Sequence, residues 1–417
     1  MSALLVWVIA AATLAAILLR PKQWKEAVWA CLGAAVLVLA RLIPAGAACR
    51  AVLKGTDVYL FLAGMMLLSE LGRREGVFNW LASLAVAAAR GSRARLFLLI
   101  YGVGIAVTIF LSNDATAVVL TPAVYAAVRK ARAPALPYLL ICAFIANAAS
   151  FVLPIANPAN LVVYGKELPP LVPWLRVFLL PSVLAIAATF AALRWVLRDE
   201  LHGEIEDTTD AVALSLEGKF AAWSIAGTGA VLIGASAVGL DLGLPTCITG
   251  VVAVLLVTRA RRKAIRRIVS DVAWSVLPLV AGLFVIVEAL ERAGGLNVVA
   301  RGFAWCAGLP RAAGALAASF GISALSNLMN NLPSGLLAGG ALHSAGVPAY
   351  IRDAVLVGVD LGPNLSVTGS LATILWLIAL RREGEHITGW EFLKIGLIVM
   401  PGALLLATMA VALVSGR

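Results

Sequence analysis

Apolar runs long enough to cross a lipid bilayer recur along this chain and constrain its fold more than any other feature. A transmembrane helix needs about 20 mostly apolar residues, and residues 3–19, 27–43, 171–196 and 390–414 form such runs. Inside lipid every backbone polar group must be satisfied internally, so the runs must form helices. Hydrophobic residues make up 62% of the chain and charged residues 13%, whereas soluble domains carry about 25% charged residues. The sequence therefore predicts an all-α polytopic membrane protein.

We expect about ten transmembrane helices, organised as two halves of similar length. The first half covers residues 1–198, an acidic cytoplasmic linker covers 199–219, and the second half covers 220–417. The linker carries Asp199, Glu200, Glu204, Glu206, Asp207, Asp210 and Glu217. The further spans that we expect cover residues 57–71, 220–238, 244–257 and 274–290, with a shorter, partly interfacial segment at 77–89. The first 19 residues carry no charge and precede Arg20 and Lys22, which is typical of a retained helix rather than a signal peptide.

A polar pentapeptide, Ser112–Thr116, interrupts the apolar segment 96–128. The segment is shorter than the roughly 40 residues that two full crossings need, and basic clusters flank it on both sides. Basic loops prefer the cytoplasmic side. We therefore predict a re-entrant hairpin that enters from the cytoplasm and turns around Ser112–Thr116. Its Asp114 is an ionisable group at membrane depth, which usually marks a transport pathway.

The polar break occurs a second time. A shift of 218 positions aligns Asn113 with Asn331 and Thr116 with Ser334, inside a second apolar segment. Short or interrupted hydrophobic segments at corresponding positions of two halves are the best sequence indication of a transporter's binding site. We therefore predict a second re-entrant hairpin around residues 328–335.

Two further segments are predicted to form discontinuous helices. Pro154 and Pro158 interrupt residues 136–163, and a polar stretch interrupts residues 354–380, where Asp360 stands opposite Asn147 at a shift of 213. Counting Lys and Arg in the loops favours two inverted repeats, with the second hairpin opening outward and both termini outside.

The residues around the four breaks are mostly amides and hydroxyls, which suit a small, polar, largely uncharged solute. No Lys or Arg lies in these breaks, so a carboxylate substrate is less expected. Helix N-termini can nevertheless hold an anion. The predicted substrate-binding residues are Ser112, Asn113, Thr116, Asn147, Ser150, Asn157, Asn330, Asn331, Ser334, Asn364, Thr368 and Ser370.

Two acids lie centrally, Asp114 and Asp360. A carboxyl group removed from water can exchange protons reversibly, so we predict that both take part in proton coupling. Binding of Na⁺ or capping of a helix end is the alternative. Glu70 and Glu288 are related by the shift of 218 and lie near Arg73 and Arg292, which favours structural ion pairs.

Other chemistries are not indicated. The sequence contains no metalloprotease, hydrolase or nucleotide-binding motif, so we expect neither an enzyme nor a bound cofactor. The five cysteines have no metal-ligand spacing. The net charge of +11 reflects short basic loops rather than nucleic-acid binding.

The residues that carry these breaks resemble the ArsB-type arsenical pumps of the ion transporter superfamily. The matching segments are LSNDATAVVLTP (111–122), AFIANAASFVLPIANPANLV (143–162), LMNNLPSGLL (328–337) and VDLGPNLSVTGSLATILWL (359–377). Members of the family commonly have an acid at the position of Asn147 and a lysine at that of Asn364, so this chain lacks both charges.

The resemblance implies efflux of arsenite or antimonite in exchange for protons, in the cell inner membrane, by movement of the hairpin unit against a scaffold. Neutral trihydroxy-arsenic would fit an uncharged polar site. Some relatives work with a soluble arsenical-pump ATPase. The alternatives are a sodium- or proton-coupled organic-acid or Na⁺/H⁺ carrier of the same superfamily, and a channel or non-transporting membrane subunit.

Overall fold

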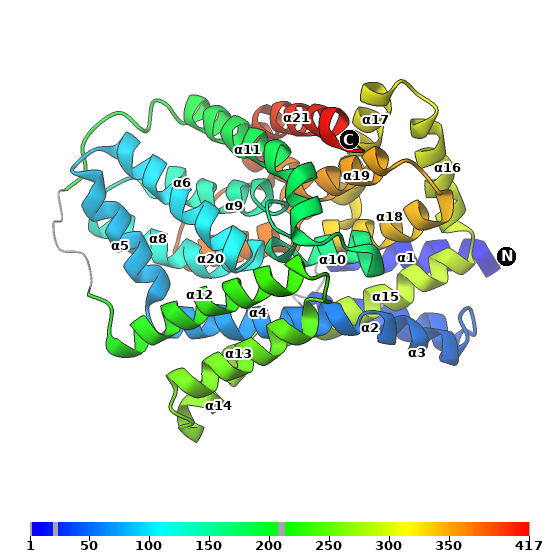
Figure 1. Cartoon of the computed structure of the whole chain (residues 1–417), viewed down its shortest axis with the longest axis horizontal. Helices are drawn as coiled ribbons and strands as arrows, with labels where there is room; N and C mark the ends of the chain where they lie inside the picture. The colour runs from blue at the N-terminus through cyan, green and yellow to red at the C-terminus, as the bar shows by residue number, and fades with distance from the viewer. Residues whose placement is uncertain (1, 20–23, 207–212, 417) are drawn as a thin grey trace.

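The computed structural model describes residues 2–19, 24–206 and 213–416. Within these ranges the secondary structure is helical, apart from one isolated β-bridge between Ser92 and Glu204. Figure 1 shows long helices running across the molecule, with both described ends of the chain in its right half. The prediction of an all-α polytopic membrane protein is confirmed.

The first half of the chain forms eleven α-helices among the described residues. They are α1 (Ser2–Leu19), α2 (Glu26–Leu39), α3 (Ala45–Lys54), α4 (Thr56–Arg74), α5 (Val77–Ala89), α6 (Arg93–Phe110), α7 (Asn113–Ala115), α8 (Thr121–Lys130), α9 (Leu136–Ala148), α10 (Pro158–Tyr164) and α11 (Leu171–Val196).

The second half continues in the same manner. Its helices are α12 (Leu216–Ala237), α13 (Gly243–Val257), α14 (Arg262–Asp271), α15 (Val276–Arg292), α16 (Gly295–Ala307), α17 (Arg311–Met329), α18 (Asn331–Ala345), α19 (Ala349–Leu361), α20 (Leu371–Arg382) and α21 (Gly389–Val414).

By length and composition, five helices of the described chain can each cross a membrane: α6, α11, α12, α17 and α21. The number rises to seven if each of two bent pairs counts as one span. These pairs are α3 with α4, bent by 48°, and α14 with α15, bent by 42°. The shift of 218 that aligns the two hairpins also carries α3 approximately onto α14 and α4 onto α15.

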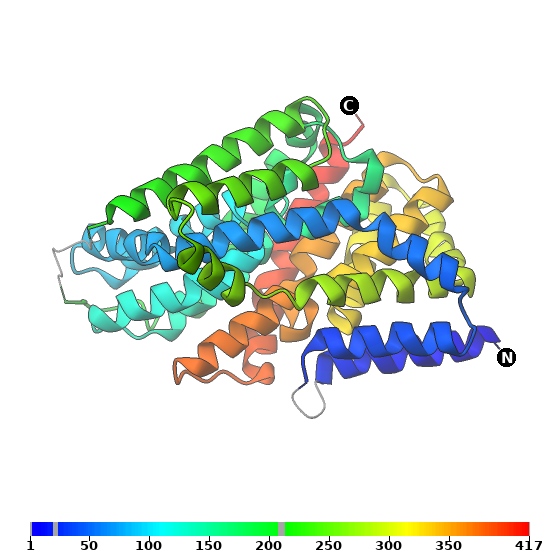
Figure 2. The ribbon, with the colours of Figure 1, turned by 90° about the horizontal axis from the view of Figure 1, so that it is seen from below.

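The bent pairs contribute to a tightly packed block of helices. Helix α4 lies against α13, and the approach is so close that a Cβ on Gly64 would come within 2.2 Å of the carbonyl oxygen of Thr246. Only glycine fits there, because no side-chain atom can occupy space taken by a neighbouring backbone. The block includes α2, which packs along α15 and lies beside α1 (Figure 2).

Charged pairs form within α4 and within α15, at the C-terminal end of each helix. Arg73 and Arg74 both bind Glu70, at 2.6 and 3.2 Å, and Arg292 binds Glu288 at 3.0 Å. The prediction that Glu70 and Glu288 each form structural ion pairs with nearby arginines is confirmed.

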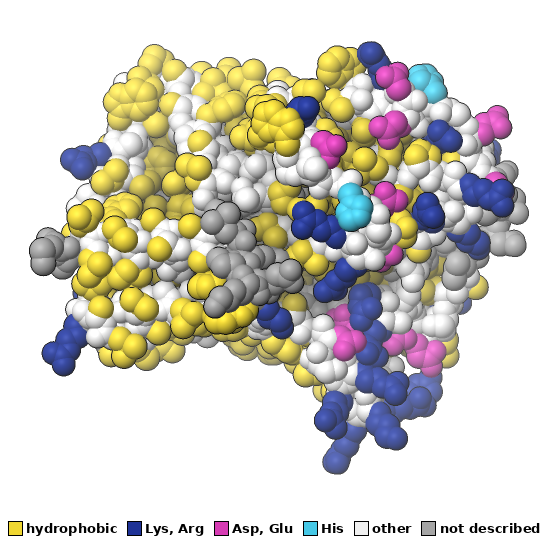
Figure 3. Space-filling view, turned by 180° about the vertical axis from the view of Figure 1, so that it is seen from behind, with side chains coloured by type: hydrophobic (Ala, Val, Ile, Leu, Met, Phe, Trp, Pro, Cys, Tyr) yellow, Lys and Arg dark blue, Asp and Glu magenta, His cyan; other side chains and the backbone are white. Residues whose placement is uncertain are grey.

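The densest basic segment of the sequence, residues 259–267, lies between two expected spans and was therefore expected to be a loop, but most of it forms a helix. Helix α14 exposes Arg262, Lys263, Arg266 and Arg267 and buries Ile268. Figure 3 shows it projecting from the surface as a mass of basic side chains, and other Lys and Arg residues gather on the same half of the face shown.

The acidic linker is attached to the base of the first hairpin. The amide of Ile205 donates to the carbonyl of Gly91 at 2.8 Å, and that of Glu206 donates to Ala131 at 3.0 Å. The linker is shorter than predicted, because Glu217 already lies in the first turn of α12. Arg20, Lys22, Asp207 and Asp210 lie outside the described residues.

Candidate substrate site

The first hairpin consists of α6, a short break and a second helical segment. The break falls at Leu111 and Ser112, slightly before the centre of the polar pentapeptide. Ser112 caps the second segment, since its Oγ accepts a hydrogen bond from the amide of Ala115 at 3.1 Å. From Thr116 to Leu120 the segment is a π-helix, a local form that is frequent at functional sites.

The second hairpin consists of α17 and α18, which are joined through Asn330. Asn330 corresponds to Ser112 at the shift of 218, but its backbone differs. Its φ is 78° and its ψ 152°, a region that non-glycine residues rarely adopt. Ser112 is extended, with φ −178° and ψ 166°. The tips therefore correspond in sequence but differ in backbone conformation.

A pair of hydroxyl groups joins the two arms of each hairpin. In the first, the Oγ1 atoms of Thr108 and Thr116 lie 2.8 Å apart. In the second, the Oγ atoms of Ser326 and Ser334 lie 2.7 Å apart. The predicted site residues Thr116 and Ser334 thus hold the hairpins closed. Thr108 and Ser326 were missed, although the shift of 218 relates them as well.

The two discontinuous helices resume at matching caps. Asn157 begins α10 and accepts a hydrogen bond from the amide of Ala159 at 3.0 Å. Ser370 begins α20 and accepts one from Ala372 at 3.2 Å. The shift of 213 that relates Asn147 to Asp360 also relates these two caps. Both cap residues are in an extended backbone conformation, as N-caps usually are.

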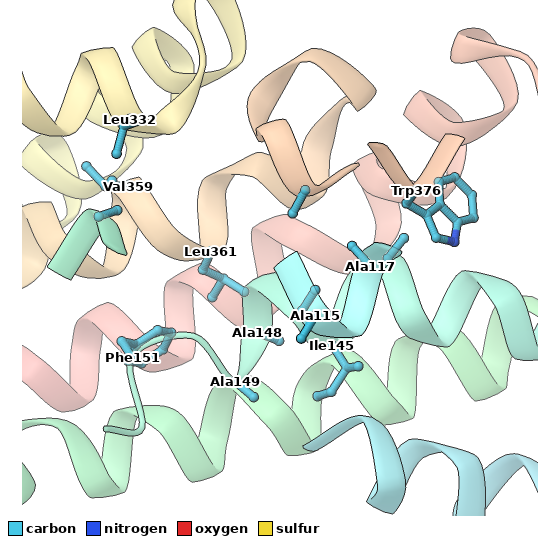
Figure 4. Packing of buried hydrophobic residues seen from close by; sticks show 14 of the residues in the cluster. Ala115, Ala117, Ile145, Ala148, Ala149, Phe151, Leu332, Val359, Leu361 and Trp376 are labelled. Carbon is cyan, nitrogen blue, oxygen red and sulfur yellow. The ribbon is translucent and has the colours of Figure 1, made fainter. Parts of the chain in front are cut away.

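The four breaks meet at one small pocket. Its lining residues are Leu62, Asn113, Asp114, Asn157, Pro158, Val276, Val280, Asn331, Leu332, Ser370, Leu371 and Ala372. The same two shifts pair several of them across the halves, for example Leu62 with Val280. Figure 4 shows apolar side chains packed around this region, among them Ala115 and Leu332.

The pocket is very small in this conformation. Its volume is about 20 Å³, whereas a cavity needs about 10–15 Å³ to hold one water molecule. A solute of several heavy atoms does not fit unless the surrounding helices move. The walls contributed by α4 and α15 are apolar, and sequence reasoning did not place them at the site.

The electrostatics of the pocket come from helix ends and one acid. The described lining residues include no Lys or Arg, and Asp114 is their one ionisable group. The segments that start at Asn113, Asn157, Asn331 and Ser370 present their N-terminal ends, which carry partial positive charge. These ends, with the amide and hydroxyl side chains, can bind oxygen atoms of a polar solute.

Asp360 lies behind this pocket, not in its wall. It is fully buried, and its Oδ1 accepts a hydrogen bond from the side-chain amide of Asn157 at 2.9 Å. Its Oδ2 has no hydrogen-bond partner among the described residues. Asp360 therefore reaches the pocket through Asn157, which itself lines it.

Asn147 and Asn364 are also set back from the pocket and bind each other. The Nδ2 of Asn147 donates to Oδ1 of Asn364 at 3.0 Å and to the hydroxyl of Thr373 at 3.3 Å. Asn364 in turn donates to the carbonyl of Phe144 at 3.0 Å. Both amides are fully buried, so this pair joins the two broken helices.

The remaining predicted site residues stabilise the breaks. The Oγ of Ser150 donates to the backbone carbonyl of Asn147 at 2.8 Å. The hydroxyl of Thr368 donates to the backbone carbonyl of Asn327 at 2.9 Å. Asn330 caps α18 through the amide of Leu332. Of the predicted set, the pocket brings together Asn113, Asp114, Asn157, Asn331 and Ser370.

The contact between Asn147 and Asn364 yields a testable prediction. Replacing Asn147 by Glu alone puts an unpaired charge in a fully buried position, which we expect to cost about 3–5 kcal/mol of stability. Adding Asn364→Lys supplies the partner charge, and we expect the doubly substituted protein to regain most of its thermal stability in detergent. A double variant that is no more stable than Asn147→Glu alone would contradict the pairing.

Two discontinuous helices and two hairpins that converge on a pocket with polar groups at its helix ends define this protein as a polytopic membrane transporter. The profile of the CitMHS family, described as citrate transporter, matches residues 4–357. The chain belongs to this family, and it is a transporter rather than an enzyme.

Its relatives include proteins named for arsenical transport. The chain is 29% identical over 374 residues to an arsenical pump membrane protein of Escherichia coli, covering 84% of each chain. It is 27% identical over 369 residues to the protein of that name from Yersinia enterocolitica, again covering 84% of each. The resemblance predicted from the sequence motifs is confirmed.

A solved structure shows the same fold. The YdaH transporter of Alcanivorax borkumensis matches with a TM-score of 0.53 over 86% of each chain, at 16% sequence identity. At this identity the match supports the fold alone.

Proposed function

We propose that this protein is a secondary active transporter of the cell inner membrane that exports arsenite or antimonite in exchange for protons. The observation that carries the proposal is the pocket at which all four breaks meet. Its polar groups are amides, a hydroxyl and helix N-terminal ends, and Asp114 is the one ionisable group among the described residues that line it. The relatives named arsenical pump membrane proteins support the same substrate class.

The chemistry of the pocket suits a neutral hydroxylated solute. Amide groups such as those of Asn113 and Asn331 both donate and accept hydrogen bonds, so they can bind the hydroxyl groups of trihydroxy-arsenic. A solute without charge requires no Lys or Arg partner. Asp114 can then carry the proton that moves in the opposite direction, because a carboxyl group partly removed from water can hold or release one.

Transport requires this small pocket to widen and to open alternately to each side. We propose that the hairpins and broken helices move as a unit against the block that contains α2, α4, α13 and α15. The two halves would act as inverted repeats. The hydroxyl pairs within each hairpin support movement of each hairpin as one piece. A soluble arsenical-pump ATPase is a further partner that the family resemblance suggests.

Everted membrane vesicles test the proposal. An imposed proton gradient, acidic inside, is expected to drive arsenite uptake into vesicles that contain the protein and not into vesicles from cells without it. The assay should include citrate and Na⁺ in parallel. Uptake of either of these without any uptake of arsenite would contradict the proposal.

The second candidate is a sodium- or proton-coupled carrier of an organic acid. Two observations favour it: the family description names citrate, and four helix N-terminal ends face the pocket, which favours anions. The two candidate functions differ in the charge of the solute that the pocket binds, neutral for arsenite and negative for citrate. Competition of citrate with arsenite uptake would indicate that one pocket accepts both, whereas citrate uptake alone would establish the second candidate.

A further inference from the structure

A second buried carboxyl group lies on the helix that carries Asp360. Asp353 and Asp360 are both in α19 and both buried, at 4% and 0% exposure. They are seven residues apart, which places them on the same face of the helix and about 10 Å apart along its axis. No role in binding explains Asp353, because it does not line the pocket.

Helix α10 contacts both carboxyl groups and forms a ladder with α19. The amide of Asn157 donates to Asp360 at 2.9 Å, and the hydroxyl of Tyr164 donates to Asp353 at 2.6 Å. Asn157 and Tyr164 are also seven residues apart. The two helices therefore run antiparallel with one polar contact at each end.

Two oxygen atoms along this ladder have no hydrogen-bond donor among the described residues. One is Oδ2 of Asp360, and the other is Oδ1 of Asn160. Asn160 follows Asn157 by three residues and precedes Tyr164 by four, so it lies on the same face of α10. Buried oxygen atoms without a partner call for water or for an added proton.

The far end of the ladder leads to solvent. Asp353 also accepts from the hydroxyl of Ser415, and Arg352 lies 5.0 Å from the ring of Tyr164. Arg352 binds Glu167 at 2.7 Å. Arg311, which donates to the carbonyls of Ala412 and Ser415, also lies at this end, as do Lys166 and His343, which is 3.2 Å from Glu167. The side chains of Glu167 and His343 are 54% and 80% exposed.

We propose that the ladder between α10 and α19 conducts protons between the substrate pocket and the end of the molecule where Glu167 and His343 are exposed, with Asp353 as the second proton carrier. The proposal rests on the proposed exchange of substrate for protons. Protons would enter from solvent beside Glu167 and His343 and reach Asp353 through water, because Arg352 keeps its own proton. From Asp353 they would pass to Asp360 and the pocket.

Each step in this route is a proton transfer alone. An O–H bond on the carboxyl group of Asp353 breaks and an O–H bond on Oδ2 of Asp360 forms. Several water molecules between the two groups, one of them donating to Oδ1 of Asn160, would each accept one proton and release another. Asn157 keeps the ionised Asp360 hydrogen-bonded, and Tyr164 and Ser415 do the same for Asp353. Both carboxyl groups can therefore exist with and without the proton.

Purified protein in proteoliposomes tests the route through two measurements. Exchange of arsenite for arsenite needs only substrate binding and movement, whereas uptake driven by an imposed proton gradient also needs proton transfer. For Asp353→Asn, which retains the shape of the side chain, we expect exchange close to the wild-type rate. We expect gradient-driven uptake to fall by about 100-fold, the lower end of what a positioned proton carrier contributes.

Two further variants separate proton transfer from a structural role. Ser415→Ala removes one hydrogen bond to Asp353 but keeps the carboxyl group, so gradient-driven uptake should persist. Asp353→Glu keeps a titratable group and should retain measurable gradient-driven uptake. Equal loss of both activities in Asp353→Asn and Ser415→Ala, or unchanged coupling in Asp353→Asn, would overturn the route. A wild-type protein that moves no arsenite would instead refute the proposed function.

Discussion

Replacing Asp114 by Asn is expected to abolish proton-driven transport while leaving the protein folded. Asp114 is the one ionisable residue among the described residues that line the pocket. Asn has almost the same shape and can occupy the same first helical turn, but it cannot carry a proton. We expect gradient-driven arsenite uptake in everted vesicles to fall by at least about 100-fold.

A matched control uses an acid of the same type outside the site. Asp271 is exposed at the end of α14 and binds Arg74 at 2.8 Å. Asp271→Asn removes a surface ion pair worth roughly 0–1 kcal/mol, so its uptake should remain close to that of the wild type. The elution profile in detergent should be the same for both variants. Wild-type uptake by Asp114→Asn would exclude Asp114 as a proton carrier.

The second large effect is expected at Asp360. Its Oδ1 accepts from Asn157, and its Oδ2 is buried without a partner. Asp360→Asn keeps the hydrogen bond from Asn157 but cannot be protonated, so gradient-driven uptake should be lost while arsenite–arsenite exchange persists. This outcome would separate proton carrying from substrate binding.

Two comparisons make the Asp360 result interpretable. Asp360→Ala leaves the buried amide of Asn157 unpaired, which should lower stability by about 1–3 kcal/mol, whereas Asp360→Asn should lower it less. If Asp360 instead binds Na⁺, transport by the wild type should require Na⁺. In that case uptake driven by the proton gradient in Na⁺-free medium would be absent from the wild type as well.

Local sequence patterns were sufficient to place most helices and all four breaks. Pro154 and Pro158 predicted the interruption of the first broken helix, which resumes at Pro158. The break in the first hairpin lies at Leu111 and Ser112, at the start of the predicted pentapeptide. Helix α14 was missed as a helix because basic side chains dominate its composition, whereas its amphipathic spacing favours a helix at a surface.

The candidate site was predicted in type but only partly in arrangement. Asn113, Asp114 and Asn331 line the pocket, as a polar break at corresponding places suggested. Thr116 and Ser334 instead form hydroxyl pairs with Thr108 and Ser326 on the opposite arm of each hairpin. These partners were missed because the helices that carry them look like apolar spans. The repeat shift could have identified both partners.

The sequence by itself determined that the chain forms membrane helices, where they are interrupted, and which polar residues accompany the interruptions. These properties depend on hydropathy, proline and residue spacing, which act over one or two helical turns. Only the tertiary structure decided that Asn147 binds Asn364 and that Asp360 reaches the pocket through Asn157. Such contacts join residues about 200 positions apart, and they depend on how helices pack against one another, which no local pattern records.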